Sequence, residues 1–181
     1  MADIQVENIV ATTHLAEHFD IPNLASSIRD CKYDPNEFSG LALNFRHPKT
    51  AALIFPSGRV VCTGAKNMDQ LEDLINRAID QIEKAGSKIP EEPEVEIQNI
   101  IATSHINKTL DLAAVAKSNL MKNIRFQPEK FPGLIIKIDN PRAVVLLFKS
   151  GKIVCTGTNN LEDASLAVNS IIEKLCSFGA L

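Results

Sequence analysis

Apolar and polar residues alternate along several short segments of the chain, and a period of two is typical of β-strands. Residues 4–12 alternate and are rich in β-branched side chains, so we expect a strand there. Three or four short strands are expected over residues 32–63, and the same number over residues 125–156. Pro48 and Pro141 punctuate these two regions, which therefore predict two meanders of antiparallel strands.

Helical patterns with a period of 3.6 residues flank these strands. Asp20 and Asp111 stand where an N-cap would begin a short helix. Asn67 and Gln70 resemble a capping box at the start of a longer helix, and Gly86 is placed to end it. The expected apolar stripes of the two long helices consist of Leu71, Leu74, Ile75, Ala78, Ile79 and Ile82, and of Leu161, Ala164, Val168, Ile171 and Leu175.

The chain contains an internal repeat. Residues 4–14 (IQVENIVATTH) match residues 95–105 (VEIQNIIATSH), and residues 33–67 match residues 126–160 with 14 identities in 35 positions. Self-similarity over so much of the chain indicates a duplicated unit. Each copy is expected to contain a strand, a short helix, a meander and a long helix.

The two copies are joined by residues 86–96, where two prolines and four glutamates are typical of an acidic linker. We therefore divide the chain into two domains, residues 1–90 and residues 91–181. A length of 181 residues, of which 45% are hydrophobic, suffices for two small globular domains or one large one.

Composition argues against several classes of protein. No apolar run approaches the roughly 20 residues that a membrane-spanning helix needs, and residues 1–10 lack the features of a signal peptide. Cys31, Cys62, Cys155 and Cys176 are widely spaced and form no CxxC pair, which favours free thiols over a disulfide scaffold or a zinc ribbon. We therefore expect a cytoplasmic protein that does not contact membranes.

The strands expected over residues 51–55 and 59–63 carry apolar side chains on both faces. One face would hold Ala52, Ile54, Val60 and Cys62, and the other Ala51, Leu53, Phe55, Val61 and Thr63. The second copy behaves in the same way. Two apolar faces need two covers, and the helices of each half supply only one. Either the two copies pack sheet on sheet as a sandwich, or they share a sheet whose second face stays open for a partner. We favour the open face because long amphipathic helices cover a single sheet face well.

The net charge of −3 is unevenly distributed along the chain. Residues 32–66 and 122–152, which contain most of the expected strands, total +8, whereas the rest of the chain totals −11. One interpretation is that the acidic helix faces are simply solvated; the other is that the basic sheet binds a polyanion. An apolar surface with a basic rim can press into the minor groove of DNA, where A·T pairs lack the amino group that a G·C pair presents. The pattern therefore favours A·T-rich DNA as the ligand.

Several motifs resemble those of the TATA-box-binding protein family, especially its archaeal members. They are the strings NIVAT and NIIAT that begin at Asn8 and Asn99, the F-x-G-L that begins at Phe38 and Phe131, and the block LIFPSGRVVCTG with its second copy LLFKSGKIVCTG. The resemblance covers nearly the whole chain. It implies an α+β fold in which two tandem pseudo-symmetric repeats form one curved antiparallel sheet, a ten-stranded saddle with the helices on its convex face.

The resemblance also implies how such a sheet would bend DNA, since this family is itself a reference case of minor-groove bending. Phe38 and Phe55 in the first half, with Phe131 and Phe148 in the second, match the family's wedges. Each pair would enter a base step at one end of the binding site and unstack it. Pro132 keeps the proline that follows the wedge in the family.

Three further groups of DNA-binding residues are implied by the resemblance. In the polar group, Asn8 and Asn99 match the family's central asparagines, whose amides donate to minor-groove acceptors, and Thr63 and Thr156 match its threonines nearby. The apolar floor consists of Val10, Leu53, Val61, Ile101, Leu146 and Val154. The basic residues expected at phosphates are Arg59, Lys137 and Lys152.

The chain departs from the family pattern at several positions. Asn44 and Lys137 stand where the family often has arginine, which puts the phosphate contact of Asn44 in particular in question. Ser39 replaces the proline that follows the first wedge. The family's contact with transcription factor B maps to Gln127, Glu129 and Lys130, and of these the first and last depart from the family pattern.

The function implied is that of a general transcription initiation factor. It would bind and bend TATA-box DNA as a monomer and present the complex to transcription factor B and RNA polymerase, in association with the nucleoid of an archaeal cell. No catalysis and no cofactor are expected. A homodimer in the absence of DNA is left open. The alternatives are a module that uses the same open sheet to bind proteins without DNA, and a carrier of an apolar ligand.

Other candidate sites are weaker. His14 and His18 have a spacing that could suit a metal on a helix, but they fall near a strand end with no further ligand in the pattern. Cys62 and Cys155 occupy equivalent positions in the two copies on the helix-covered face, so we expect core thiols without a redox role. Neither a nucleophile elbow nor a phosphate-binding loop is found in the sequence.

Overall fold

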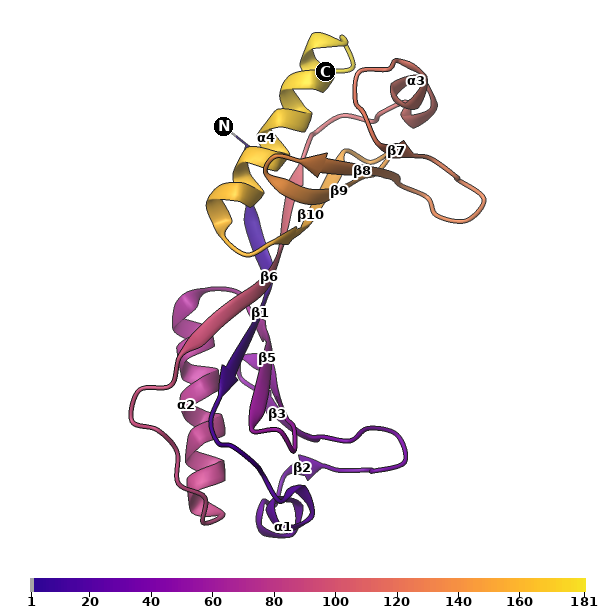
Figure 1. Ribbon diagram of the computed structural model, residues 1–181. Coiled ribbons are helices and arrows are strands. Elements are labelled where there is room, and N and C mark those ends of the chain that lie inside the picture. Colours follow the sequence, from indigo (N-terminus) through magenta and orange to yellow (C-terminus); the bar gives the residue numbers. More distant parts are fainter. Residues whose placement is uncertain (1) are drawn as a thin grey trace. The chain divides into compact units, whose positions relative to one another are not determined.

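The computed structural model describes residues 2–181 (Figure 1). The first series of elements is β1 (Gln5–His14), α1 (Ile21–Ser27), β2 (Cys31–Lys32), β3 (Leu41–Arg46), β4 (Lys49–Ile54), β5 (Arg59–Ala65) and α2 (Met68–Lys84). The second series is β6 (Val95–His105), α3 (Leu112–Lys117), β7 (Ile124–Arg125), β8 (Leu134–Asp139), β9 (Arg142–Leu147), β10 (Lys152–Thr158) and α4 (Leu161–Ser177). The identical order of elements confirms the predicted duplication.

The strands form a ten-stranded antiparallel sheet in the order β2-β3-β4-β5-β1-β6-β10-β9-β8-β7. The residues group into two compact units. The N-terminal unit comprises Asn8–Gln98, and the C-terminal unit comprises residues 2–7 together with Asn99–Leu181. Strands β1 and β6 therefore contribute residues to both units.

Each unit has one long helix that packs on the sheet strands of the same unit. Helix α2 lies against β4 and β5, and α4 lies against β9 and β10 (Figure 1). None of the helices in the described part of the chain has the length and apolarity needed to cross a bilayer.

The N-caps predicted from the sequence are confirmed. The side chains of Asp20, Asn67 and Asp111 each accept a hydrogen bond from a backbone N–H in the first helical turn. The capping box of α2 differs in one detail, because the side chain of Gln70 accepts from the backbone N–H of Lys66, one residue before the N-cap. The side chains of Asn67 and Gln70 thus satisfy the backbone N–H groups of Gln70 and Lys66, respectively.

One residue of the predicted apolar stripes is placed wrongly. Leu161 is 48% exposed, whereas Ala164, Val168, Ile171 and Leu175 are buried. Leu161 is the first residue of α4, directly after the N-cap Asn160. The buried side of the helix begins only with Ala164, one turn later.

The alternation along β4 and β5 divides their side chains as the sequence predicted. Ala52, Ile54, Val60 and Cys62 are fully buried beneath the helix of their unit. The residues predicted for the other face are only half-buried, namely Ala51, Leu53, Phe55, Val61 and Thr63. Strands β9 and β10 show the same pattern. Each unit therefore has one sheet face covered by its helix and a second face that its own long helix leaves uncovered.

Candidate nucleic-acid interface

We call the half-buried second face of each unit its open face. In the N-terminal unit its apolar floor is formed by Val10, Ala42, Ala51, Leu53 and Val61. In the C-terminal unit the equivalent floor is formed by Ile101, Ile135, Val144, Leu146 and Val154. Strand pairing makes each floor continuous, since Leu53 pairs with both Ala42 and Val61 and Leu146 pairs with both Ile135 and Val154.

The four phenylalanines expected to act as wedges lie in two pairs. Phe38 and Phe55 pack edge to face with ring centroids 5.3 Å apart, and Phe131 and Phe148 do so at 5.8 Å. Phe38 is 36% exposed and the other three rings are half-buried, so no ring is enclosed in the core of its unit. Edge-to-face packing holds each pair in a defined geometry while leaving apolar ring surface accessible.

Backbone hydrogen bonds in turns hold the main chain at each phenylalanine of the two pairs. The backbone N–H of Phe131 donates to the carbonyl of Gln127 in the loop before β8, and that of Phe148 donates to the carbonyl of Lys152 across the β9–β10 turn. Phe38 and Phe55 make the equivalent bonds to Asp34 and Arg59. Two loops distant in sequence thus deliver one ring each to the same place.

Glycines lie beneath the aromatic pairs. A Cβ atom on Gly40 would lie 2.8 Å from Cε1 of Phe38, and one on Gly133 would lie 2.8 Å from Cε1 of Phe131 and 3.1 Å from Cε1 of Phe148. Because real Cβ atoms essentially never approach within 3.0 Å, a side chain at these positions would displace the ring of Phe38 or Phe131. This role of the two glycines was not predicted from the sequence, although the F-x-G-L motif contains both.

Each predicted asparagine is hydrogen-bonded to the threonine expected beside it. Nδ2 of Asn8 donates to Oγ1 of Thr63 over 3.0 Å, and Nδ2 of Asn99 donates to Oγ1 of Thr156 over 2.9 Å. The resemblance had placed these residues near each other without indicating the bond. The structure brings all four onto the open faces as two matched pairs.

A glycine backbone orients each asparagine amide. Oδ1 of Asn8 accepts from the N–H of Gly64 at 2.6 Å, and Oδ1 of Asn99 accepts from the N–H of Gly157 at 2.8 Å. Both glycines have positive φ angles, +98° and +89°, which favour glycine. With the oxygen held by the backbone and one Nδ2 hydrogen held by threonine, the second Nδ2 hydrogen of each amide is left to donate elsewhere.

Two of the three cations expected at phosphates occupy equivalent strand ends. Arg59 begins β5 opposite His14, and Lys152 begins β10 opposite His105. Both cations are exposed, and within residues 2–181 neither forms an ion pair or a side-chain hydrogen bond. An exposed cation without a carboxylate partner is available to an anion.

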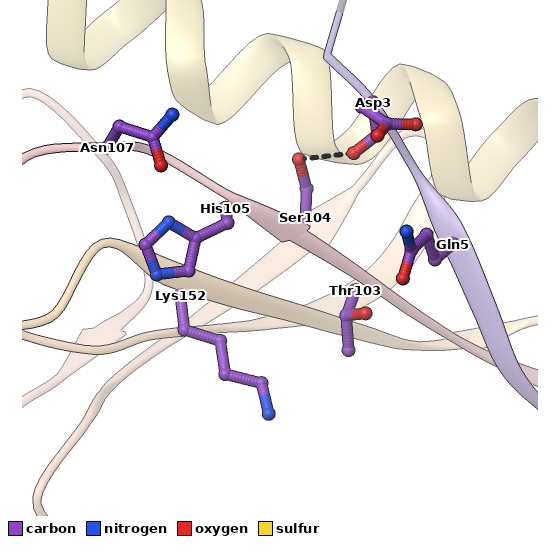
Figure 2. A pocket seen from close by; sticks show the side chains of 7 residues that line it. All are labelled: Asp3, Gln5, Thr103, Ser104, His105, Asn107 and Lys152. Carbon is purple, nitrogen blue, oxygen red and sulfur yellow. Dashed lines mark hydrogen bonds between the residues drawn. The ribbon is translucent and has the colours of Figure 1, made fainter.

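Lys152 also borders a polar cavity of about 480 Å³ in the C-terminal unit (Figure 2). Its walls come from the start of β1 and the end of β6, where Oγ of Ser104 donates to the backbone carbonyl of Asp3. The lining consists of polar and charged residues, among them Thr103 and His105. The cavity is therefore a solvated border of the sheet.

The remaining predicted site residues are exposed, except for Gln127, which is half-buried. Lys137 lies on β8 next to the floor, and Pro132 follows the wedge Phe131 in the loop before β8. In the same loop Glu129 and Lys130 are exposed, and the side chain of Gln127 accepts hydrogen bonds from Arg125 at 3.0 and 3.2 Å.

The thiols of the covered face are inert. Burial raises the pKa of Cys62 to about 12 and that of Cys155 to about 11, so both stay protonated at neutral pH. His14 ends β1, as the sequence indicated. In the described residues no group of three His, Cys, Asp or Glu side chains is arranged to hold a metal ion.

Comparison with known proteins places the chain in a family. The family described as "Transcription factor TFIID (or TATA-binding protein, TBP)" matches residues 3–85 and 94–178. The TATA-box-binding protein of Archaeoglobus fulgidus is 42% identical over 178 residues, which cover 98% of this chain and 97% of that protein. The TATA-box-binding protein of Picrophilus torridus is also 42% identical, over 97% of each chain.

A solved structure agrees with the sequence comparison. The structure of Methanococcus jannaschii TBP superposes with a TM-score of 0.87 and 36% sequence identity, over 97% of this chain and 99% of that one. A family of transcription factors also accords with the prediction that the protein is not an enzyme. The chain belongs to the TATA-binding protein family.

Proposed function

We propose that this protein is a general transcription initiation factor that binds the minor groove of TATA-box promoter DNA through the open faces of both units and bends it. The observation that supports this most strongly is the doubled combination of an apolar floor, an edge-to-face phenylalanine pair and an oriented asparagine on each open face. The names of its relatives specify the DNA element.

Preference for A·T pairs follows from the chemistry of the floor. Leu53, Val61 and their equivalents present only carbon to the groove. A guanine amino group pressed against such a wall loses its hydrogen bonds to water and gains none, whereas A·T pairs present only acceptors. The asparagines complement these acceptors, because the free Nδ2 hydrogen of each amide is a donor.

Bending follows from the phenylalanine pairs. A ring pushed between two base pairs replaces base stacking by ring–base contact, at a cost of a few kcal/mol per step. The apolar floor offsets this cost, since a bent duplex with a widened minor groove contacts more of it. Gly40 and Gly133 leave room for the rings in this geometry, because a Cβ atom at either position would displace them.

The downstream partners belong to the same proposal. Transcription factor B contacts the loop with Gln127, Glu129 and Lys130, and the bent complex recruits RNA polymerase at the nucleoid. Glu129 and Lys130, which are adjacent and exposed in this loop, carry opposite charges, which distinguishes the loop from a uniformly acidic docking loop. In the absence of DNA, two copies cover their apolar open faces by forming a homodimer.

A titration tests the proposal. The protein is added to a duplex with a TATA element, labelled at both ends for distance measurement, and to a control duplex in which G·C pairs replace the element. We expect tight binding and end-to-end shortening with the first duplex only. Phe131→Ala and Phe148→Ala should reduce both, whereas Leu166→Ala, on the exposed side of α4, should change neither. Equal binding of both duplexes would overturn the proposal and favour a module that binds proteins.

A further inference from the structure

The open faces of the two units differ in a consistent direction. Three pairs of equivalent floor residues are not identical, and in each the residue of the N-terminal unit is the smaller. Val10 is matched by Ile101, Ala42 by Ile135 and Ala51 by Val144. The remaining floor positions are a leucine and a valine in both units.

The two alanines lie together. Ala42 pairs with Leu53 on the neighbouring strand, and Ala51 pairs with Asn44, two residues along β3 from Ala42. Ala42 and Ala51 are therefore diagonal neighbours on one face, at a distance where larger side chains would touch. In the C-terminal unit the same diagonal is filled by Ile135 and Val144. The floor of the N-terminal unit thus has smaller side chains than that of the C-terminal unit over one continuous area of β3 and β4.

Charge beside this area differs as well. Asn44, paired with Ala51, is replaced in the C-terminal unit by Lys137, paired with Val144. Both side chains are exposed. Farther along the same strands the difference reverses, since Arg46 is matched by Asp139, whose carboxylate accepts a hydrogen bond of 3.4 Å from Asn123. The C-terminal unit therefore has a cation paired with Val144 where the N-terminal unit has the uncharged Asn44 paired with Ala51.

We infer that the C-terminal unit is the stronger DNA-binding half of this protein, and that Ala42 and Ala51 weaken the N-terminal half; this rests on the proposed function. Strand register is the same in both halves, so no shift in pairing restores the apolar surface that is missing at the two alanines. Each methylene removed from an apolar interface weakens binding about fourfold. The difference between the two floors is large enough to decide which half occupies the better end of an asymmetric site.

Orientation on DNA tests this inference. The duplex carries a self-complementary A·T element in which one end is interrupted by a G·C pair. A DNA-cleaving iron chelate is attached to Asn36→Cys, in the exposed loop of the N-terminal half, with the exposed Cys176 replaced by serine. Cleavage near the interrupted end means that the C-terminal half has taken the intact end.

We expect cleavage of the parent complex mainly at the interrupted end. The double substitution A42I/A51V should tighten binding by about tenfold or more and remove the bias. Exchange of both pairs, A42I/A51V/I135A/V144A, should reverse it. Unbiased cleavage by the parent, or an exchange variant that keeps the parent's orientation, would overturn the inference. If the exchange variant does not fold, A42I/A51V decides, because its added atoms lie on the open face.

The outcome separates this inference from the proposed function. A parent protein that does not distinguish the A·T element from a G·C-rich duplex contradicts the function itself. A parent that makes this distinction but binds in both orientations equally contradicts only the inequality of the halves. Intact folding of each variant is checked by its circular dichroism and thermal unfolding.

Discussion

The side-chain oxygen of Asn99 accepts a hydrogen bond of 2.8 Å from the backbone N–H of Gly157, 58 residues along the chain. This bond decides which end of the amide is available to a ligand, because it occupies the oxygen and leaves the nitrogen outward. Asn8 and Gly64 repeat it in the N-terminal unit at 2.6 Å. The two donors that we assign to minor-groove readout are therefore held by the backbone before any DNA is bound.

Replacing Asn99 by aspartate tests this arrangement. The carboxylate of Asn99→Asp can still accept from Gly157 but has no hydrogen to donate, and its charge faces the acceptors of the groove. We expect specific affinity for the TATA duplex to fall by about tenfold or more, corresponding to about 1–3 kcal/mol. Binding measurements with the TATA duplex and with a random duplex give the ratio. An equal loss on both duplexes would show that Asn99 takes no part in readout.

Replacing Gly133 by alanine tests the support beneath a wedge pair. The new methyl group would lie 2.8 Å from Phe131 and 3.1 Å from Phe148, so the rings must move. We expect the bend angle to decrease, as measured by energy transfer between the duplex ends. In the background of Phe131→Ala, the same change should reduce the bend angle much less, since the closest ring atom is gone. An equal reduction of the bend angle in both backgrounds would mean that Gly133 acts independently of the Phe131 ring.

The buried hydroxyl of Thr158 is expected to lower stability. Within the described residues its Oγ1 has no hydrogen-bond partner, although the residue is only 3% exposed. Thr158→Val keeps the shape and removes the orphan group, which should stabilise the fold by about 1–2 kcal/mol. The matched control introduces threonine at the equivalent buried position of the other half, Ala65→Thr, which should destabilise. Thermal unfolding midpoints measure both, and a midpoint lowered by Thr158→Val would refute the argument.

The buried thiols predict a loss of stability at alkaline pH. Their pKa values are raised by burial to about 12 and about 11, above the usual value near 9. The unfolded chain therefore loses these protons before the folded protein does, so the stabilisation is complete below about pH 9 and is lost as pH rises toward 11–12. A variant with Cys62→Val and Cys155→Val should show a shallower alkaline decline in unfolding free energy. An identical decline in parent and variant would assign it to other groups.

Salt dependence tests the phosphate contacts. Arg59→Gln and Lys152→Gln each remove one exposed cation at a strand end, and each should reduce the slope of log affinity against log salt by about 0.9. Lys174→Gln, on α4, removes a charge from the helix-covered side and serves as the control. We expect its slope to match that of the parent. A slope unchanged by Arg59→Gln would place that guanidinium away from the DNA backbone.

Local patterns in the sequence accounted for the elements and their faces. The alternation along β4 and β5 separated Ala52 and Ile54 from Ala51 and Leu53, and burial follows the same division. Side-chain direction is set by the backbone period within each strand, so it can be read from neighbouring residues alone. The N-caps at Asp20 and Asp111 are local for the same reason.

The amino-acid sequence alone determined the duplication, the order of elements, the covered and open faces, and the residue types on each. Tertiary structure decided which of these residues touch: the two rings of each phenylalanine pair, the glycines beneath them and the bond from Gly157 to Asn99. The same holds for the orphan hydroxyl of Thr158 and the exposure of Leu161. Periodicity is a property of one segment, whereas a contact depends on the register between segments and on the space their packing leaves, and these are settled only when the chain folds.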